Sequence, residues 1–225
     1  NAGRVRPSRF MIDNFIRAGG GRRGNQGTYN KYVYCSTTDP RYDATFIVSY
    51  VRQDTGKSAS YYPTEAKIPT TSSPFIRKYL DPSYDVSNGK ADFYLMRYAE
   101  IYLIAAEASA ELSTGKGDEN WNRAISLINE LRLRARKSVD VGEAICPPDF
   151  VDDDFDTKED LINAIMWERI VEMVGEGHEF FDTHRRGATW LLDNIANPAN
   201  DFYFINRGTA DPEVNCAYVE YFYKG

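Results

Sequence analysis

Both histidines of the chain lie in one short acidic stretch, "EGHEFFDTH", which runs from Glu176 to His184. Histidines four residues apart share a helix face and bind zinc, with a glutamate as general base, in the H-E-x-x-H pattern. Here the residue four after His178 is Asp182, and His184 comes six after it. The spacing argues against a zinc site, so we expect no metal, no cofactor and no catalytic residue here.

The same stretch has a structural interpretation. Gly175 precedes it and Gly177 is its second residue, and glycine is the usual residue just past a helix end. We therefore expect a buried turn beyond a helix. Phe180 and Phe181 are expected in the core because large aromatic side chains favour burial.

Two further segments have compositions that could bind ligands, but their spacing is wrong. The glycine-rich segment 19–27 carries Arg22 and Arg23 but lacks the G-x-x-x-x-G-K-[ST] spacing of a phosphate loop. The acidic segment 149–156 has Asp154 where an EF-hand loop needs glycine. We expect both to be surface loops. A carboxylate pair for glycoside hydrolysis stays open, because acids are plentiful but no pair is marked.

Composition narrows the class of protein. The net charge of -6 and the pI of about 5.1 argue against broad nucleic-acid binding. The sequence contains no run of about 18 apolar residues of the kind that spans a membrane. Cys35, Cys146 and Cys216 are too few and too far apart for a disulfide framework or a zinc site.

The periodicity predicts a mainly α fold. Apolar residues repeat at helical spacing from the expected N-cap Asp118 to Lys137 and, before it, over 95–112. The members of the earlier repeat are Leu95, Tyr98, Tyr102, Ala105, Ala106, Ser109 and Ala110. Two helices joined by a short glycine turn form an αα-hairpin of the tetratricopeptide type. The expected face of the second helix has these members: Trp121, Ala124, Ile125, Ile128, Leu131 and Ala135.

Other local signals complete this prediction. Thr157 with Asp160 predicts a capping box that opens a third helix, which runs to Val174. The basic residues Arg132, Arg134, Arg136 and Lys137 fit the negative end of the second helix. Upstream, a turn at 39–43 precedes a β-branched and aromatic segment, 44–52, which predicts a strand.

Three segments occur in a fixed order and together resemble a known family. They are "DFYLMRYAEIYLIAAEASAEL" (92–112), "AISLINELRLRAR" (124–136) and "IMWERIVEMVGEGHEFFDTHRRG" (165–187). The chain resembles the C-terminal half of the RagB/SusD family, and "RPSRFMIDNF", "DPRYDATFIV" and "IRKYL" resemble the family's middle segment. The resemblance implies a loop-rich middle segment over 1–92 and a helical C-terminal region over 93–225, with the N-terminal half of the family fold absent from this chain.

The resemblance also implies a function. Family members are non-catalytic glycan-binding lipoproteins on the outer-membrane surface of Bacteroidetes. They capture oligosaccharides for a SusC-like TonB-dependent transporter in nutrient uptake and polysaccharide utilization. The membrane contact would be a lipid anchor outside this chain. Two alternatives stay open: a tetratricopeptide-like protein-interaction scaffold, and a metal- or carboxylate-dependent glycoside hydrolase.

Residue roles divide into two groups. The charged residues of the family motif are expected to be structural and ion-paired: Arg97, Glu100, Glu107, Glu168, Arg169, Glu172, Glu176, Asp182 and Arg185. Aromatic rings stack on sugar faces, and composition alone offers these candidates: Tyr29, Tyr32, Tyr34, Tyr61, Tyr62, Trp190 and Tyr203. Arg22, Arg23, Asn25 and Gln26 are candidate hydrogen-bond partners for a sugar.

Overall fold

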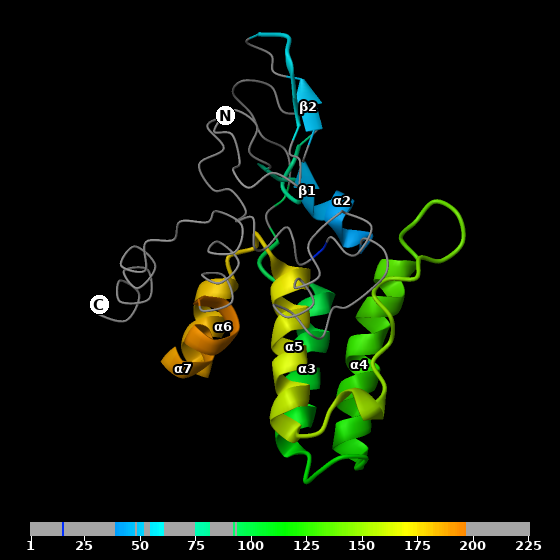
Figure 1. Ribbon diagram of the computed structural model, residues 1–225, viewed down its shortest axis with the longest axis vertical. Coiled ribbons are helices and arrows are strands. Elements are labelled where there is room, and N and C mark those ends of the chain that lie inside the picture. The colour runs from blue at the N-terminus through cyan, green and yellow to red at the C-terminus, as the bar shows by residue number, and fades with distance from the viewer. Residues whose placement is uncertain are drawn as a thin grey trace, which may run out of the picture.

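Three long helices form the body of the protein. The computed structural model describes residues 15, 39–47, 49–51, 55–60, 75–81, 92 and 94–196. Figure 1 shows α3 (Tyr98–Leu112), α4 (Glu119–Arg136) and α5 (Lys158–Met173) side by side. The short helices α6 (Glu179–Arg186) and α7 (Ala188–Leu191) lie beside α5. A π-helical turn, Leu192–Ala196, follows them. The predicted mainly α class is confirmed.

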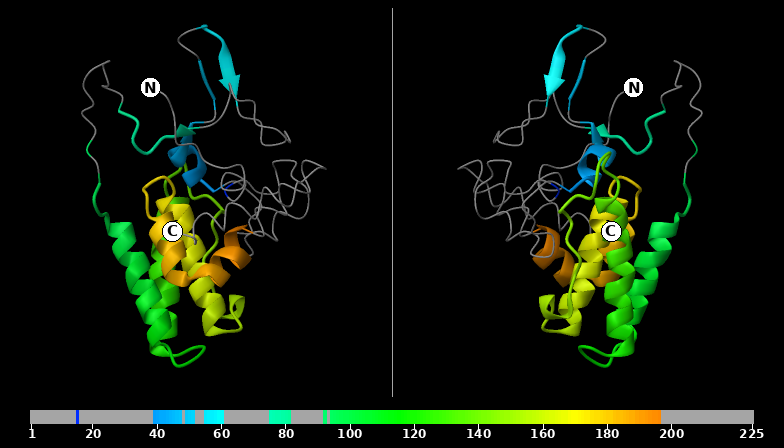
Figure 2. Two further views of the ribbon diagram at one scale, coloured as in Figure 1. Left: turned by 90° about the vertical axis from the view of Figure 1, so that its left-hand side faces the viewer. Right: turned by 90° about the vertical axis from the view of Figure 1, so that its right-hand side faces the viewer.

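The strands are short and lie at one end of the bundle, as both views of Figure 2 show. Strand β1 (Phe46–Ile47) pairs antiparallel with β4 (Phe75–Ile76), with Phe46 opposite Ile76. Strand β2 (Ser49–Val51) pairs antiparallel with β3 (Ser58–Ser60), with Ser49 opposite Ser60.

The predicted strand over 44–52 is wrong in its first two residues. Ala44 and Thr45 belong to the short helix α2 (Arg41–Thr45). The backbone carbonyl of Asp39 accepts from the Tyr42 amide at 2.9 Å, and its side chain accepts from the Arg41 amide at 2.9 Å. This hydrogen bonding turns the expected 39–43 turn into a helical start, so extended backbone begins only at Phe46.

The α3–α4 pair is the predicted αα-hairpin. The side chain of Asp118 accepts from the Trp121 amide at 2.7 Å and so caps α4. Ala106 and Ala110 of α3 and Ala124 of α4 are fully buried in one cluster that also includes α5 residues. Small side chains at these positions let the helix axes approach closely.

The buried face of α3 agrees with the predicted repeat in the second half of the helix and departs from it at the start. The helix begins at Tyr98, and Leu95 and Tyr98 are 87% and 76% exposed. Ala106, Ser109 and Ala110 are buried as predicted, and Ala99 and Leu103 are buried in addition. Because α3 is apolar on more than one side, a simple count of apolar repeats does not identify the whole face that packs. For α4, whose other face is polar, all six predicted residues are buried.

Helix α5 is the centre of the bundle. The predicted capping box is present: the Thr157 hydroxyl accepts from the Asp160 amide at 3.1 Å, and Asp160 accepts from the Thr157 amide at 3.2 Å. Every residue from Ala164 to Met173 is buried. The helix ends at Met173, and Gly175, two residues further on, has a φ of +79° that favours glycine. A Cβ there would also lie 2.8 Å from the Ile76 side chain.

The basic residues near the end of α4 hold the following loop. Arg132 is fully buried, and its Nε donates to the Pro148 carbonyl at 2.5 Å. Arg136 donates to the Pro147 carbonyl at 2.8 Å and to Asp149 at 2.7 Å. These contacts go beyond the expected match to the helix dipole. Within the loop, Asp152–Asp154 forms one 3-10 turn.

The prediction for the "EGHEFFDTH" stretch is wrong in two respects. The stretch is largely helix α6 rather than a turn, and its phenylalanines are not in the core. Phe180 is 49% exposed and Phe181 is 70% exposed. The residue that α6 buries is Asp182, because an ion pair with Arg169 of α5 turns that side of α6 inward.

We expect Ala106→Leu to destabilise the fold by about 1–3 kcal/mol, because extra methylenes do not fit a packed helix crossing. Urea unfolding followed by helical circular dichroism would measure this change. Ala108→Leu is the matched control, since Ala108 lies on the exposed side of the same helix. Equal stability of the two variants would contradict the packing described here.

Candidate functional site

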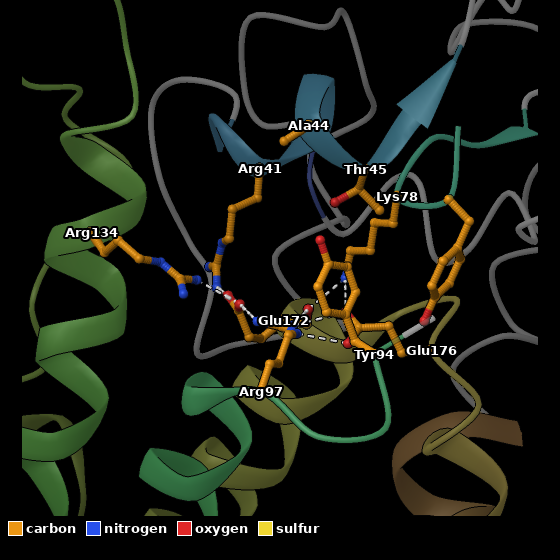
Figure 3. Close-up of a pocket in the computed structure, with 10 residues that line it drawn as sticks. Arg41, Ala44, Thr45, Lys78, Tyr94, Arg97, Arg134, Glu172 and Glu176 are labelled. Atoms are coloured by element: carbon orange, nitrogen blue, oxygen red, sulfur yellow. Dashed lines mark hydrogen bonds and ion pairs between the residues drawn. The ribbon is translucent and has the colours of Figure 1, made fainter. Parts of the chain in front are cut away.

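A row of carboxylates on α5 organises the site. Glu168, Glu172 and Glu176 are four residues apart, so the first two share one helix face and the third follows just past the helix end. Each meets cations from other parts of the chain. Figure 3 shows Arg41, Arg97 and Arg134 extending toward Glu172 from three different elements.

Glu172 is shared by three arginines. Its Oε1 accepts from Arg97 Nη1 at 2.6 Å and from Arg134 Nη2 at 2.5 Å, and its Oε2 accepts from Arg41 Nη1 at 3.2 Å. Burial raises the pKa of this carboxyl, but the positive charges of Arg41, Arg134 and Arg97 outweigh burial and lower the pKa to about 2. Glu172 is therefore a permanent anion near neutral pH.

Glu176 links the segment that contains Lys78 to Arg97 at the start of α3. Its Oε1 accepts from Lys78 Nζ at 2.6 Å, and its Oε2 accepts from Arg97 Nε at 2.7 Å. Burial by itself raises the pKa of this carboxyl, but the hydrogen bonds from Arg97 and Lys78 give a net lowering. Burial also lowers the pKa of Lys78, an effect that its bond to Glu176 opposes.

Glu168 holds the deepest part of the network. It accepts from Arg41 Nη1 at 2.6 Å and from Arg132 Nη1 at 2.9 Å, and its side chain is 1% exposed. Asp39 fixes the other side of Arg41, with 2.7 Å between Oδ2 and Nη2. Ions removed from water to this extent are stable only when they are paired.

A second group of ion pairs fastens α6 to the bundle. Arg169 donates to Asp182 at 2.5 Å and to Glu100 at 3.1 Å. Arg185 bonds Glu107 through both guanidinium Nη atoms and donates to Asp182 at 3.2 Å. The structure thus places all nine charged residues of the expected structural set in ion pairs with one another or with Arg41, Lys78, Arg132 and Arg134.

A cavity of about 250 Å³ opens beside this network. Its lining combines charged groups with two tyrosines from separate segments, as Figure 3 shows in part. The lining residues are Arg41, Ala44, Thr45, Lys78, Tyr79, Tyr94, Arg97, Arg134, Glu172 and Glu176. Arg41 is balanced by Asp39 outside the lining, so Lys78, Arg97 and Arg134 face two carboxylates with a formal excess of one positive charge. Such a surface suits a polar ligand with negative charge and a ring to contact the tyrosines.

Most of the aromatic candidates from composition lie outside the described residues: Tyr29, Tyr32, Tyr34, Tyr61, Tyr62 and Tyr203. So do Arg22, Arg23, Asn25 and Gln26. Trp190 is described and lies in the core, 7% exposed, with its indole nitrogen donating to Asn163 at 2.6 Å. Its expected stacking role does not fit this placement.

Sequence reasoning missed the cavity residues Lys78, Tyr79, Tyr94 and Arg134 as a site. The segment "IRKYL", which contains Lys78 and Tyr79, was singled out only for its family resemblance. Arg134 stood in a basic run that a helix dipole explained. The missing information was spatial, because the side chains that surround Glu172 come from positions 38 to 131 residues away in sequence.

The two histidines do not share a ligand in the structure. His178 Nδ1 lies 3.4 Å from a Glu100 oxygen, while His184 Nδ1 lies 2.9 Å from the Phe180 carbonyl of its own helix. Within the described ranges, no three His, Cys, Asp or Glu side chains are grouped so as to hold a metal ion. Cys146 is a buried thiol, and Cys35 and Cys216 lie outside the described residues.

Comparison with known proteins identifies the class. The model of the SusD family matches residues 1–223, and the chain belongs to this family. SusD-like protein P2 of Formosa agariphila is 32% identical over 139 residues, which make up 58% of this chain and 26% of the relative. The chain thus matches about a quarter of that relative's length. No solved structure matches. Of the described helices, none has the length and apolar character needed to cross a bilayer.

We expect Glu168→Gln to cost about 3–5 kcal/mol of stability, because it leaves the buried Arg132 without its anion and removes one of the carboxylates that hold Arg41. Chemical denaturation at neutral pH gives the value. Glu130→Gln removes the same charge from an exposed position on α4 and is expected to change little. A Glu168 variant as stable as the Glu130 variant would show that the pair contributes nothing.

Stability should fall as the pH drops from about 4.5, the ordinary pKa of a glutamate, toward about 2. The folded pKa of Glu172 is depressed, so its contribution is fully present above the unfolded pKa and is lost as the pH passes through the folded value. Denaturation curves between pH 2 and 6 would follow the loss. Glu172→Gln should flatten this slope and Glu130→Gln should keep it; identical slopes would refute the assignment.

Proposed function

We propose that the chain acts as a non-catalytic, cell-surface glycan-binding protein that captures oligosaccharides for a SusC-like TonB-dependent transporter. The observation that carries the proposal is the match of the SusD family model to residues 1–223. In this proposal the protein is a lipoprotein of the outer membrane of a Bacteroidetes-type bacterium. It serves nutrient uptake from polysaccharides.

The charged cavity supports a ligand-binding role. Tyr79 and Tyr94 offer aromatic rings, and Tyr94 is 60% exposed. Tyrosine combines a flat apolar face with a hydroxyl, and both features suit a sugar ring. We propose this cavity as one part of the glycan site. The tyrosines at 29, 32, 34, 61, 62 and 203 remain candidates for the rest.

The chemistry of the cavity favours binding over hydrolysis. A glycosidase needs one carboxylic acid whose raised pKa keeps its proton for the leaving group. The pKa values of Glu172 and Glu176 move the other way, because arginine and lysine hydrogen bonds hold both as anions. Neither acid of this cavity fits the role of general acid.

A protein-interaction scaffold is a second candidate function, and the outer face of α3 favours it. Tyr98, Ile101, Ile104 and Leu112 are 76%, 42%, 47% and 70% exposed. A helix that is apolar all round is normally covered on all sides. This exposed apolar face could pack against a helix of a partner protein, such as the transporter.

The proposal predicts binding without turnover. Affinity gel electrophoresis against a panel of neutral and acidic polysaccharides should show retarded migration with at least one of them. A reducing-end assay on the same mixtures should show no product. A SusC-like transporter should copurify with the protein.

Two results would count against the proposal. Binding to a protein partner with no binding to any polysaccharide would favour the scaffold. In that case Ile101→Lys should abolish the interaction, while Arg123→Gln, on the exposed face of α4, should leave it intact. Sugar turnover that chelator or His178→Ala removes would favour the hydrolase.

A further inference from the structure

The charge of the cavity points to the kind of sugar. Of the cavity's cations, Arg41 is already balanced by Asp39. Lys78, Arg97 and Arg134 remain, and they face two carboxylates, Glu172 and Glu176, a formal excess of one positive charge. We propose that the cavity binds the carboxylate or sulfate group of an acidic saccharide, an inference that rests on the glycan-binding function proposed above. A neutral sugar would leave this positive excess uncompensated.

The positive excess is fixed by the network. Both oxygens of Glu172 and both oxygens of Glu176 already accept hydrogen bonds from arginine or lysine. Those anions are therefore engaged, and guanidinium groups stay charged at any physiological pH. The local field differs in sign from that of the whole chain, whose net charge is -6. An acidic polymer would thus be repelled by most of the protein and attracted at this cavity.

Among the cations of the cavity, Arg134 uses the fewest of its N–H donors within the part of the chain that the structure describes. Its side chain is 52% exposed, and among the described residues only its Nη2 donates, to Glu172. A guanidinium has five N–H donors in a planar fork that matches the two oxygens of a carboxylate or a sulfate. Arg41 and Arg97 are committed to the fold by several bonds each. Arg134 therefore makes the contact that a ligand needs without dismantling the bundle.

The remaining lining suits one sugar ring. Small-molecule pockets in proteins occupy about 300–1,000 Å³, and this cavity of about 250 Å³ lies just below that range. It accommodates a single unit of a longer chain. Tyr94 lies in the same lining as the cations, which allows a ring to stack while its acidic substituent reaches Arg134.

The test compares acidic with neutral polymers on the full chain. Polygalacturonate supplies carboxylates, chondroitin sulfate supplies sulfate esters with carboxylates, carrageenan supplies sulfate esters alone, and dextran is neutral. Calorimetry at low and moderate salt should give binding to at least one acidic polymer, at least tenfold tighter than to dextran. Affinity should weaken with salt, because charge pairing drives it. The pattern over polygalacturonate and carrageenan separates the carboxylate from the sulfate source.

Variants assign the effect to the cavity. Arg134→Gln should weaken acidic binding about tenfold or more, the usual cost of losing a charged hydrogen bond, and leave the melting temperature within a degree or two. Arg123→Gln removes the same charge from an exposed position on the same helix that does not line the cavity. It should change neither quantity. Tyr94→Ala should weaken binding with the melting temperature again preserved.

The outcomes separate this inference from the proposed function. Equal binding of dextran and the acidic polymers, or equal losses in the Arg134 and Arg123 variants, overturns the acidic-saccharide inference and leaves glycan binding intact. Binding to no polysaccharide at all contradicts the proposed function itself.

Discussion

The structure depends on anions of α5 that are buried and cannot be left without partners. Glu168 and Glu172 lie on a helix that is buried from Ala164 to Met173, so the cations that neutralise them must come from the surrounding elements. Arg41 arrives from α2 and Arg132 from α4. Each guanidinium fixes both the distance and the orientation of the element that carries it. The short helices, the strands and the loop after α4 are thereby positioned relative to the bundle.

Ion pairs fix the relative positions of the helices and strands more tightly than apolar packing alone would. An apolar contact tolerates sliding, whereas a guanidinium that bonds two carboxylates has one geometry. Arg41 makes this plain: Asp39 holds one side of it and Glu168 the other. The side effect is a local surplus of cations, because the elements that converge on Glu172 bring more positive charge than α5 offers negative charge. The charged cavity is thus a consequence of how the fold is held together.

The sequence predicted the local features and missed the distant ones. The Asp118 cap, the Thr157 capping box and the buried face of α4 depend on residues within a few positions, and all are present. The packing face of α3 was predicted at Ala106, Ser109 and Ala110 but not at its start, because α3 is apolar on several sides there. The Arg41–Glu168 bond spans 127 positions in sequence, and no periodicity marks it. The cavity is defined by such long-range contacts, so its residues could be named only after the fold was known.

The stretch "EGHEFFDTH" shows how charged residues whose types suggest a metal site can serve the fold. Its spacing argued against a zinc site, and the structure gives its acids other partners. Glu176 bonds Arg97 and Lys78, and Asp182 bonds Arg169 and Arg185. A catalytic acid must be free to exchange its proton, whereas the hydrogen bonds from Arg97 and Lys78 hold the pKa of Glu176 below its ordinary value. Glu176 thereby fastens the end of α5 to the start of α3, and Asp182 fastens α6 to α5, so both acids hold the fold together.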